Sequence, residues 1–361
     1  MGAQTQTVAA GAAAAQIAGD HNSVTITQAG ATLRLDRLHT RKAKPATPIE
    51  LLRTDVRATT FVGRGAQLQQ LADWRGAPQR IAVRCIIAGA GTGKTRLAIE
   101  ACEAAAADGW IAAFAPYAEL VRFHATQNLV HWVLPQDAFI VIDSAATSLT
   151  VLKAWFAFLA PERDRLNGGK LRILLLERQA DPEEGWWAEL IRRESADRAG
   201  PADLIGKEAL LALPALEAVQ DRRVLLAETM RLAAPLLDPP TAVQQPPPPG
   251  ADTGFDARLA DSRIDNEPLY LMMAGVHAAR HGAPTALALD RKELAGEMVE
   301  IETARLETFA RARGFTDDGK LLKHLAACVT LQNGCTTATL TALVKRKCRR
   351  LDYRRRSIVR R

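Results

Sequence analysis

One segment of the sequence restricts the fold more than any other, because a strand-like stretch, a glycine-rich loop and a helix-forming stretch follow one another directly. The apolar run from Ile81 to Ala88 predicts a buried strand, and the run from Lys94 to Ala107, rich in Ala, Leu and Ile, predicts a helix. Between them the chain reads Ala88-Gly89-Ala90-Gly91-Thr92-Gly93-Lys94-Thr95, a phosphate-loop pattern with alanine in place of the usual first glycine. This order predicts a phosphate-binding loop (P-loop) at the carboxyl end of a strand.

The residue types of this loop suit a polyphosphate and its metal ion. Glycines let the backbone curl so that successive amides point at phosphate oxygens, and the helix N-terminus adds the positive end of its dipole. Lys94 supplies a positive charge for the β- and γ-phosphates, and the Thr95 hydroxyl is placed to ligate Mg²⁺. A glycine-rich turn with a surface lysine is the alternative. The expected nucleotide contacts are Gly89, Ala90, Gly91, Thr92, Gly93, Lys94, Thr95 and Arg96.

A second apolar run ends in an acidic residue suited to the same metal ion. Phe139 to Ile142 predicts a buried strand, and Asp143 follows it directly. An aspartate in this place is a second Mg²⁺ ligand beside Thr95. The alternative is an aspartate that caps the next helix. No acid follows in Ser144-Ala145-Ala146 to orient an attacking water, so we expect hydrolysis to be slow or absent.

A third apolar run, Leu171 to Leu176, is followed by Glu177 and Arg178. An arginine at the carboxyl edge of a strand beside the P-loop strand is able to reach the γ-phosphate and to report its presence. A solvated or ion-paired arginine is an equally good interpretation. The residues expected to act on the phosphates and metal are therefore Lys94, Asp143 and Arg178.

Short apolar strands that alternate with helices predict an α/β fold, with a parallel sheet covered by helices on both faces. The chain divides into a small, polar N-terminal appendage with one short β segment, outside the main core (1–57), and a P-loop NTPase domain (58–234). A Pro-rich linker or loop (235–257), a mainly helical region (258–343) and a basic tail (344–361) follow.

Composition limits the cellular setting and the partners. No stretch approaches the roughly 18 uncharged apolar residues of a spanning helix, and no Lys or Arg precedes Arg34 to begin an export signal. The five cysteines are scattered without a paired spacing and fit reduced thiols. We therefore expect a cytoplasmic protein without a membrane partner.

The positive charge of the chain is concentrated at its C-terminal end. Residues 345–361 hold ten basic residues and one acid, a net charge of +9, so the rest of the chain carries −2 of the total of +7. This tail is a candidate for nonspecific contact with nucleic-acid phosphates, and a solvated charge run is the alternative.

Taken together, these motifs resemble those of STAND-type NTPases, the signalling branch of the AAA+-related P-loop ATPases that includes NB-ARC proteins and bacterial defence ATPases. Phe61-Val62-Gly63-Arg64 resembles the family's entry motif, although Gly65 stands where an acid often follows. Arg172 to Arg178 resembles the strand that ends in the sensor arginine, and Asn266-Glu267-Pro268-Leu269-Tyr270-Leu271 resembles the motif whose proline packs near the base.

The resemblance implies that Phe61, Val62, Gly63, Arg64 and Pro268 border the base of ATP or ADP, and that residues 258–343 form a helical lid and a winged-helix-like module. It also implies a molecular switch in signalling or defence, in which nucleotide exchange drives opening and self-association. Two other functions stay open: an AAA+-like DNA-associated ATPase anchored by the basic tail, and a nucleotide-binding scaffold without hydrolysis.

Two weaker features complete the set of candidates. His277 and His281 stand four residues apart on an expected helix, a spacing that can hold a metal ion, but without a third ligand nearby they fit two solvent-facing histidines better. The segment Gln16 to Ile26 loosely resembles short amyloid-forming signalling motifs. A disordered tail or a local hairpin is the alternative.

Overall fold

The structure is a computed structural model of the chain, and it describes residues 14–16, 23–28, 31–40, 44–126, 136–162, 169–192, 199–261 and 267–312. The chain divides into two units, residues 1–291 and residues 292–361. The predicted winged-helix-like end of the helical region, the basic tail and Asn266 lie outside the described residues. In the part of the chain that is described, no helix is both long and apolar enough to cross a membrane.

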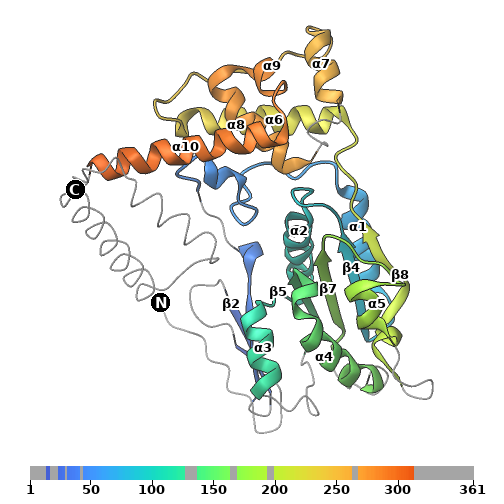
Figure 1. Cartoon of the computed structure of the whole chain (residues 1–361). Coiled ribbons are helices and arrows are strands. Elements are labelled where there is room, and N and C mark those ends of the chain that lie inside the picture. Colours follow the sequence, from blue (N-terminus) through green and yellow to red (C-terminus); the bar gives the residue numbers. More distant parts are fainter. Residues whose placement is uncertain are drawn as a thin grey trace, which may run out of the picture. The chain divides into compact units, whose positions relative to one another are not determined.

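The first unit is built on an eight-stranded sheet (Figure 1). In chain order the strands are β1 (Ala14–Gln16), β2 (Ser23–Gln28), β3 (Ala31–Asp36), β4 (Ile81–Ile87), β5 (Ile111–Phe114), β6 (Ala138–Asp143), β7 (Leu171–Glu177) and β8 (Ile205–Ala212). Their order across the sheet is β1-β2-β3-β5-β6-β7-β4-β8. The last five of these pair in parallel, and β1, β2 and β3 add an antiparallel edge. The predicted α/β class with a parallel sheet is confirmed.

Helices connect the strands and then form a layer of their own. The helices are α1 (Gly65–Gly76), α2 (Lys94–Ala107), α3 (Tyr117–Thr126), α4 (Leu149–Glu162), α5 (Gly185–Ile191), α6 (Val219–Ala233), α7 (Thr253–Ala260), α8 (Pro268–His281), α9 (Ala283–Ala286) and α10 (Arg291–Ala312). Short 3-10 turns are η1 (Leu38–Thr40), η2 (Ile49–Leu52), η4 (Ala145–Ser148), η5 (Pro201–Leu204) and η6 (Ala234–Leu236). Apart from Arg291, α10 belongs to the second unit.

The central strands are buried on both faces, because their successive side chains enter two different cores. On β6, Ile140 and Ile142 pack into the core that α3, α4 and α5 cover, whereas Phe139 and Val141 pack into the core beneath α1 and α2. β7 alternates in the same way. Continuous apolar runs are therefore needed for a sheet with helices on each side. Because β4, β7 and β6 pair in parallel, their carboxyl ends lie at one edge.

The N-terminal segment contributes to the main core, which differs from the expectation of an appendage outside it. Leu33 is fully buried and Leu35 is 1% exposed, and both belong to the cluster formed by the central strands. β3 reaches this cluster because it pairs with β5, with Asp36 opposite Phe114. Sequence alone did not reveal this position, because the segment's polar, small residues gave no sign of a long-range strand partner.

The helical layer that follows the sheet is centred on α6 and α8, which pack directly against each other. A Cβ at Gly275 would lie 2.6 Å from the Thr229 Cβ, so glycine is needed for this close approach. The Pro-rich stretch is bound to the same layer: Thr241 Oγ1 donates to the Ala279 carbonyl at 2.8 Å, and Arg223 bonds to the Pro247 carbonyl and pairs with Asp256. The stretch is thus a loop fastened at several points.

Candidate functional site

The P-loop lies between β4 and α2, as the sequence predicted, and its shape depends on two glycines. Gly91 and Gly93 have φ values of +84° and +95°, which side chains other than hydrogen rarely tolerate. The Thr92 hydroxyl donates to the Gly89 carbonyl at 2.9 Å and closes the turn. The backbone therefore turns tightly into the N-terminus of α2, where unpaired amides favour an anion.

Lys94 is held across the base of the loop rather than extended into solvent. Its Nζ donates to the Ala88 carbonyl at 2.7 Å and to the Gly89 carbonyl at 2.9 Å. Burial lowers the pKa of Lys94, and this effect is opposed by the nearby carboxylates of Asp143, Glu177 and Glu267. The ammonium group is thus positioned by the loop itself, in a place where acidic side chains already surround it.

Asp143 and Thr95 meet although their strands are not adjacent. β7 lies between β4 and β6, so the aspartate reaches across one strand. The Thr95 hydroxyl donates to Asp143 Oδ2 at 2.8 Å, and Asp143 Oδ1 accepts from the Ser144 amide at 2.9 Å. Ser144 itself has a φ of +56°, a sharp turn immediately after the strand. This arrangement brings the Thr95 hydroxyl oxygen and Asp143 Oδ2 together at the sheet edge.

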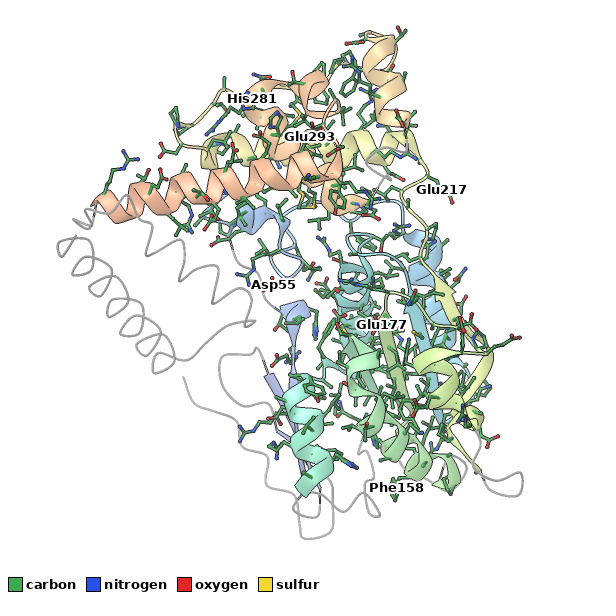
Figure 2. The ribbon with its side chains drawn as sticks, in the orientation of Figure 1. Asp55, Phe158, Glu177, Glu217, His281 and Glu293 are labelled. Carbon is green, nitrogen blue, oxygen red and sulfur yellow. The ribbon has the colours of Figure 1, made fainter. Side chains whose placement is uncertain are left out.

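The end of β7 brings the carboxylate of Glu177 to the same edge (Figure 2), and Arg178 follows it directly in the chain. Glu177 Oε2 accepts from the Ala146 amide at 3.0 Å, and Oε1 accepts from the Arg178 amide at 2.7 Å. Arg178 is exposed, and its charge contributes to the lowered pKa of Lys94. The structure thus places Arg178 within electrostatic range of Lys94, and it adds Glu177, to which sequence reasoning gave no role.

A cavity of about 220 Å³ continues from the loop toward the helical layer. Phe61, Val62, Arg64 and Pro268, four of the five residues expected at the base, line it. The lining comes from the P-loop with the start of α2 and from three other parts of the chain, near residues 51–64, 216–225 and 268–272. The lining residues are Leu51, Leu52, Arg53, Thr54, Ala58, Thr59, Thr60, Phe61, Val62, Arg64, Gly91, Thr92, Gly93, Lys94, Thr95, Arg96, Leu216, Leu225, Pro268, Leu269 and Met272.

Five predicted site residues do not line this cavity: Gly63, Gly89, Ala90, Asp143 and Arg178. Gly63 lies against α6 and the residues before it, since a Cβ there would lie 2.8 Å from Leu216 Cδ2 and 2.9 Å from Asp221 Oδ2. Gly89 and Ala90 are exposed in the first half of the loop. Asp143 connects to the cavity through Thr95, which is both a lining residue and its hydrogen-bond partner.

Two arginines fix the cavity wall to the loop and to α2. Arg64 is 4% exposed and its Nη2 donates to the Thr92 carbonyl at 3.3 Å. Arg96 Nη2 donates to the Thr59 carbonyl at 3.0 Å, and its guanidinium lies 5.6 Å from the centre of the Phe61 ring. These contacts tie the cavity wall near Thr59 and Phe61 to the P-loop and to α2.

The α6 and α8 helices contribute to the same site. Glu228 on α6 accepts from the Thr60 amide at 2.7 Å and from its hydroxyl at 3.2 Å. The Leu269 amide at the start of α8 donates to the Gly91 carbonyl at 3.2 Å. A Cβ at Gly93 would lie 3.8 Å from Pro268 Cγ, so the proline is close to the loop. The helical layer is therefore part of the wall of the candidate site.

These residues fit a nucleotide with Mg²⁺. The loop supplies curled amides and one ammonium group, which suit phosphate oxygens. Thr95 and Asp143 supply two oxygen ligands 2.8 Å apart, close to the roughly 3 Å between neighbouring ligands of an octahedral ion with bonds near 2.1 Å. The rest of the cavity is mainly apolar, with a few polar groups, as small-molecule sites usually are.

Sequence reasoning missed the two segments around Leu51 and Met272 and the acidic residue Glu267. The first lies in a region assigned to the appendage, and the second lies one helical turn after Pro268, without a signal of its own. Glu267 stands in the quoted motif directly before Pro268, but only the proline was given a role. Its carboxylate lies against the P-loop, a placement that no local pattern indicates.

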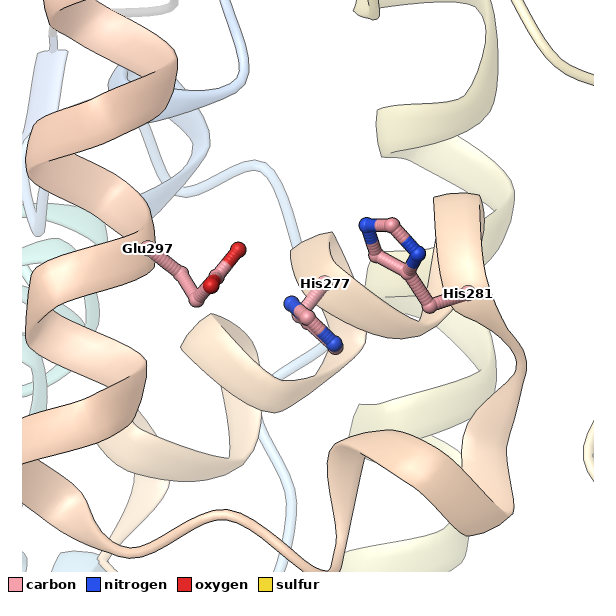
Figure 3. A group of neighbouring side chains, drawn as sticks. All are labelled: His277, His281 and Glu297. Carbon is pink, nitrogen blue, oxygen red and sulfur yellow. The ribbon is translucent and has the colours of Figure 1, made fainter.

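His277 and His281 lie on α8 (Figure 3), and neither lines the cavity. Their rings stack, with 4.4 Å between centroids and 29° between planes. His281 is exposed as expected, but the expectation of a solvent-facing His277 is wrong, because it is 7% exposed. Glu297, the third residue in that figure, belongs to the second unit.

A scan against protein-family models finds no match, and a search of curated proteins finds no significant match. Among solved structures, the chain is similar to a Walker-type ATPase of Pyrococcus abyssi, with 14% identity, a TM-score of 0.38, and 72% of this chain and 79% of that chain covered. It is also similar to the Orc1 protein of Aeropyrum pernix in complex with DNA, with 14% identity, a TM-score of 0.38, and coverage of 82% and 85%.

A third similar structure is AMPPCP-bound DnaA from Aquifex aeolicus, with 10% identity, a TM-score of 0.36, and coverage of 84% of this chain and 95% of that chain. These identities and TM-scores are too low to carry a conclusion about family or function. The strand order, the loop after β4 and the Thr95–Asp143 pair give the chain the fold of a P-loop NTPase by its own geometry.

Proposed function

We propose that this chain is a nucleotide-controlled switch of the STAND type, which holds ADP in a closed form and exchanges it for ATP to open and self-associate. The observation that carries the proposal is the convergence of three features: the curled loop with Lys94, the Thr95–Asp143 pair, and the cavity that runs from the loop to Pro268. Such a site offers separate contacts to phosphates, metal and base.

Each part of the proposed site has a distinct task. The loop amides and Lys94 bind the phosphates, and Arg178 reads the γ-phosphate from the adjacent strand. Thr95 and Asp143 would hold Mg²⁺, which when bound neutralises phosphate charge. Phe61, Val62 and Pro268 border the base. Gly89, Ala90, Gly91, Thr92 and Gly93 shape the loop, and Arg64 and Arg96 hold the wall in place.

Slow turnover fits a switch better than a motor. No acid stands at 144–146, and both oxygens of Glu177 already accept backbone hydrogen bonds. A long-lived nucleotide state can then define the conformation, provided that the two forms bind ADP and ATP with different affinities, because equal affinities shift no equilibrium. The contacts of α6 and α8 with the site supply a physical route for such a difference, since nucleotide and helical layer share the same wall.

The test is a pair of measurements on the full chain and on Lys94→Ala. Calorimetric titration should show Mg²⁺-dependent binding of ADP and ATP to the wild-type protein, and light scattering should show a larger particle in ATP than in ADP. Lys94→Ala should bind nucleotide much more weakly and should not assemble at nucleotide concentrations that saturate the wild type. If the wild-type chain has no Mg²⁺-dependent nucleotide affinity, or if Lys94→Ala behaves like it, the proposal is wrong.

The basic tail supports a second candidate, an AAA+-like ATPase that acts on DNA. Its net charge of +9 over residues 345–361 would bind phosphate backbones with a steep salt dependence. DNA-stimulated turnover, together with a salt slope that disappears when residues 345–361 are removed, would favour this function over the switch.

A further inference from the structure

The carboxylate of Glu267 lies directly on the first half of the P-loop. A Cβ added at Gly91 would lie 3.0 Å from Glu267 Oε2, and one added at Gly89 would lie 3.5 Å from Oε1. The carboxylate is also near enough to Lys94 that each group shifts the pKa of the other. An acidic side chain therefore stands beside the place where the loop would receive phosphates.

The backbone holds Glu267 in this position. The residue precedes α8, its carbonyl accepts from the Tyr270 and Leu271 amides at 3.1 Å, and the Leu269 amide donates to the Gly91 carbonyl at 3.2 Å. The start of α8 is thus bonded to the loop itself. Movement of Glu267 away from the loop would require either a change of side-chain rotamer or a shift of the helix start.

The burial of Glu267 is energetically unfavourable, because one carboxylate oxygen lacks a hydrogen-bond partner among the described residues. It is 7% exposed, and within the described part of the chain Oε2 has no hydrogen-bond partner. Oε1 pairs with Arg291 Nη2 at 3.3 Å. Burial raises the pKa of Glu267, and attraction to Lys94 opposes that effect. A buried acceptor without a partner costs free energy, so this placement is not explained by stability.

A role as a simple helix cap does not account for the side chain. Although Glu267 occupies the N-cap position of α8, its carboxylate makes no capping hydrogen bond. Among the described residues it forms an ion pair with Arg291, through Oε1. What the position does provide is a negative charge against the P-loop, in a largely buried place where charge interactions are stronger than in bulk water.

We propose that Glu267 sets the phosphate selectivity of the site, by opposing the binding of polyphosphates and opposing a triphosphate more than a diphosphate. This inference rests on the proposed nucleotide site. Like charges repel in proportion to the charge that is added, so ATP loses more affinity than ADP. In the absence of ligand, the same carboxylate acts as a counter-ion for Lys94. The residue thereby favours the ADP form and speeds nucleotide release.

The experiment compares the wild-type chain with Glu267→Gln and Glu267→Ala in calorimetric titrations with Mg-ATP and Mg-ADP. Both substitutions remove the charge, and the alanine variant separates this effect from a new hydrogen bond made by the glutamine amide. We expect affinity for ATP to rise about tenfold and affinity for ADP to rise about threefold, with slower ATP release in a stopped-flow chase. Glu189→Gln, which alters a surface ion pair with Lys153, is the control and should match the wild type.

The outcomes separate this inference from the proposed function. If the wild-type chain binds nucleotide in a Lys94-dependent way but both Glu267 variants keep its ATP-to-ADP affinity ratio, or bind ATP more weakly, the role of Glu267 is wrong and the switch proposal stands. If neither the wild type nor the variants bind nucleotide, the proposed function fails and this inference fails with it. Circular dichroism of each variant shows that the compared proteins are folded.

Discussion

Under the proposed function, the phosphate end of the site comes from eight consecutive residues, 88–95, and one aspartate, whereas the base end is assembled from segments near residues 51–64, 216–225 and 268–272. The first is built from backbone geometry and charge, and the second from apolar packing between distant parts of the chain. Substitutions at the phosphate end should therefore act on binding in a way that depends on ligand charge. Those at the base end should act equally on ATP and ADP, or through stability.

The largest effect is expected at Lys94. Replacement by alanine removes charge-assisted hydrogen bonds worth about 3 kcal/mol, so affinity for Mg-ATP should fall roughly a hundredfold in calorimetric titration. Lys153→Ala, which removes a partly exposed lysine paired with Glu189 on α5, is the matched control and should bind as the wild type does. A Lys94→Ala protein that retains wild-type affinity would remove the distinction between the two ends.

The next effect concerns the stability of the folded chain near His39, which is linked to the cavity wall through Arg57 and Glu100. The His39 carbonyl accepts from Arg57 Nη1 at 3.0 Å, and Arg57 pairs with Glu100, which also binds Arg96 of the cavity wall. Burial lowers the pKa of His39 to about 4, helped by repulsion from Arg37. The imidazole is 4% exposed, and neither ring nitrogen has a hydrogen-bond partner within the described residues.

Because the pKa of His39 is lower in the folded state than the value near 6.5 of an unfolded chain, its contribution to stability is full above pH 6.5 and is lost as the pH falls toward 4. We expect the free energy of unfolding in urea to drop by about 2 kcal/mol between pH 7.5 and 5 through this residue. His39→Phe should flatten that change, and the exposed His124→Gln should not. Equal pH profiles for wild type and His39→Phe would contradict the assignment.

A smaller, metal-dependent effect is expected at Asp143. Asp143→Asn keeps the size of the side chain but removes its charge, so affinity for ATP should fall about tenfold in Mg²⁺ and remain nearly unchanged in EDTA. Asp108→Asn, at the other end of α2, is the control. A loss of the same size with and without Mg²⁺ would mean that Asp143 holds the loop through Thr95 rather than the metal.

The smallest effect is expected at Met272, where α8 lines the base end. Met272→Ala removes apolar contact worth about 1 kcal/mol, so ATP and ADP should both bind about fivefold more weakly. Met273 is its neighbour on α8 but does not line the cavity, so Met273→Ala provides the matched comparison. Unequal losses for ATP and ADP would show that this residue senses phosphate charge from a distance.

The sequence predicted the strand, loop and helix around residues 81–107 and the place of Asp143 well, because their signals are local. An apolar strand, glycines and a lysine at fixed spacing identify the loop, and the apolar run before Asp143 places the aspartate at the sheet edge. The fold class followed from the same alternation of strands and helices. The roles of these residues in binding stay predictions until nucleotide is measured, and so do the domain boundaries and the functions of Arg178 and Pro268.

The base end could not be predicted in the same way, because its parts meet only through tertiary packing. Leu51 and Met272 have no shared pattern in the sequence, and Glu267 contacts the P-loop from nearly 180 residues away. The burial of Leu33 was missed for a similar reason, because its strand, β3, pairs with β5, which follows α2 in the sequence. Contacts of this kind depend on which strand edges and helix faces remain free after the sheet has formed.

The antiparallel strands at the N-terminal side also change what one edge of the sheet offers to another molecule. Without them, β5 would expose a free row of backbone N–H and C=O groups, which is a template for pairing with another chain. β3 pairs with β5 at Asp36 and Phe114, and the outermost strand on this side of the sheet is β1, with three described residues. Within the described part of the chain, this edge therefore offers little length for a foreign strand to extend, in contrast to the eight-residue β8 at the opposite edge.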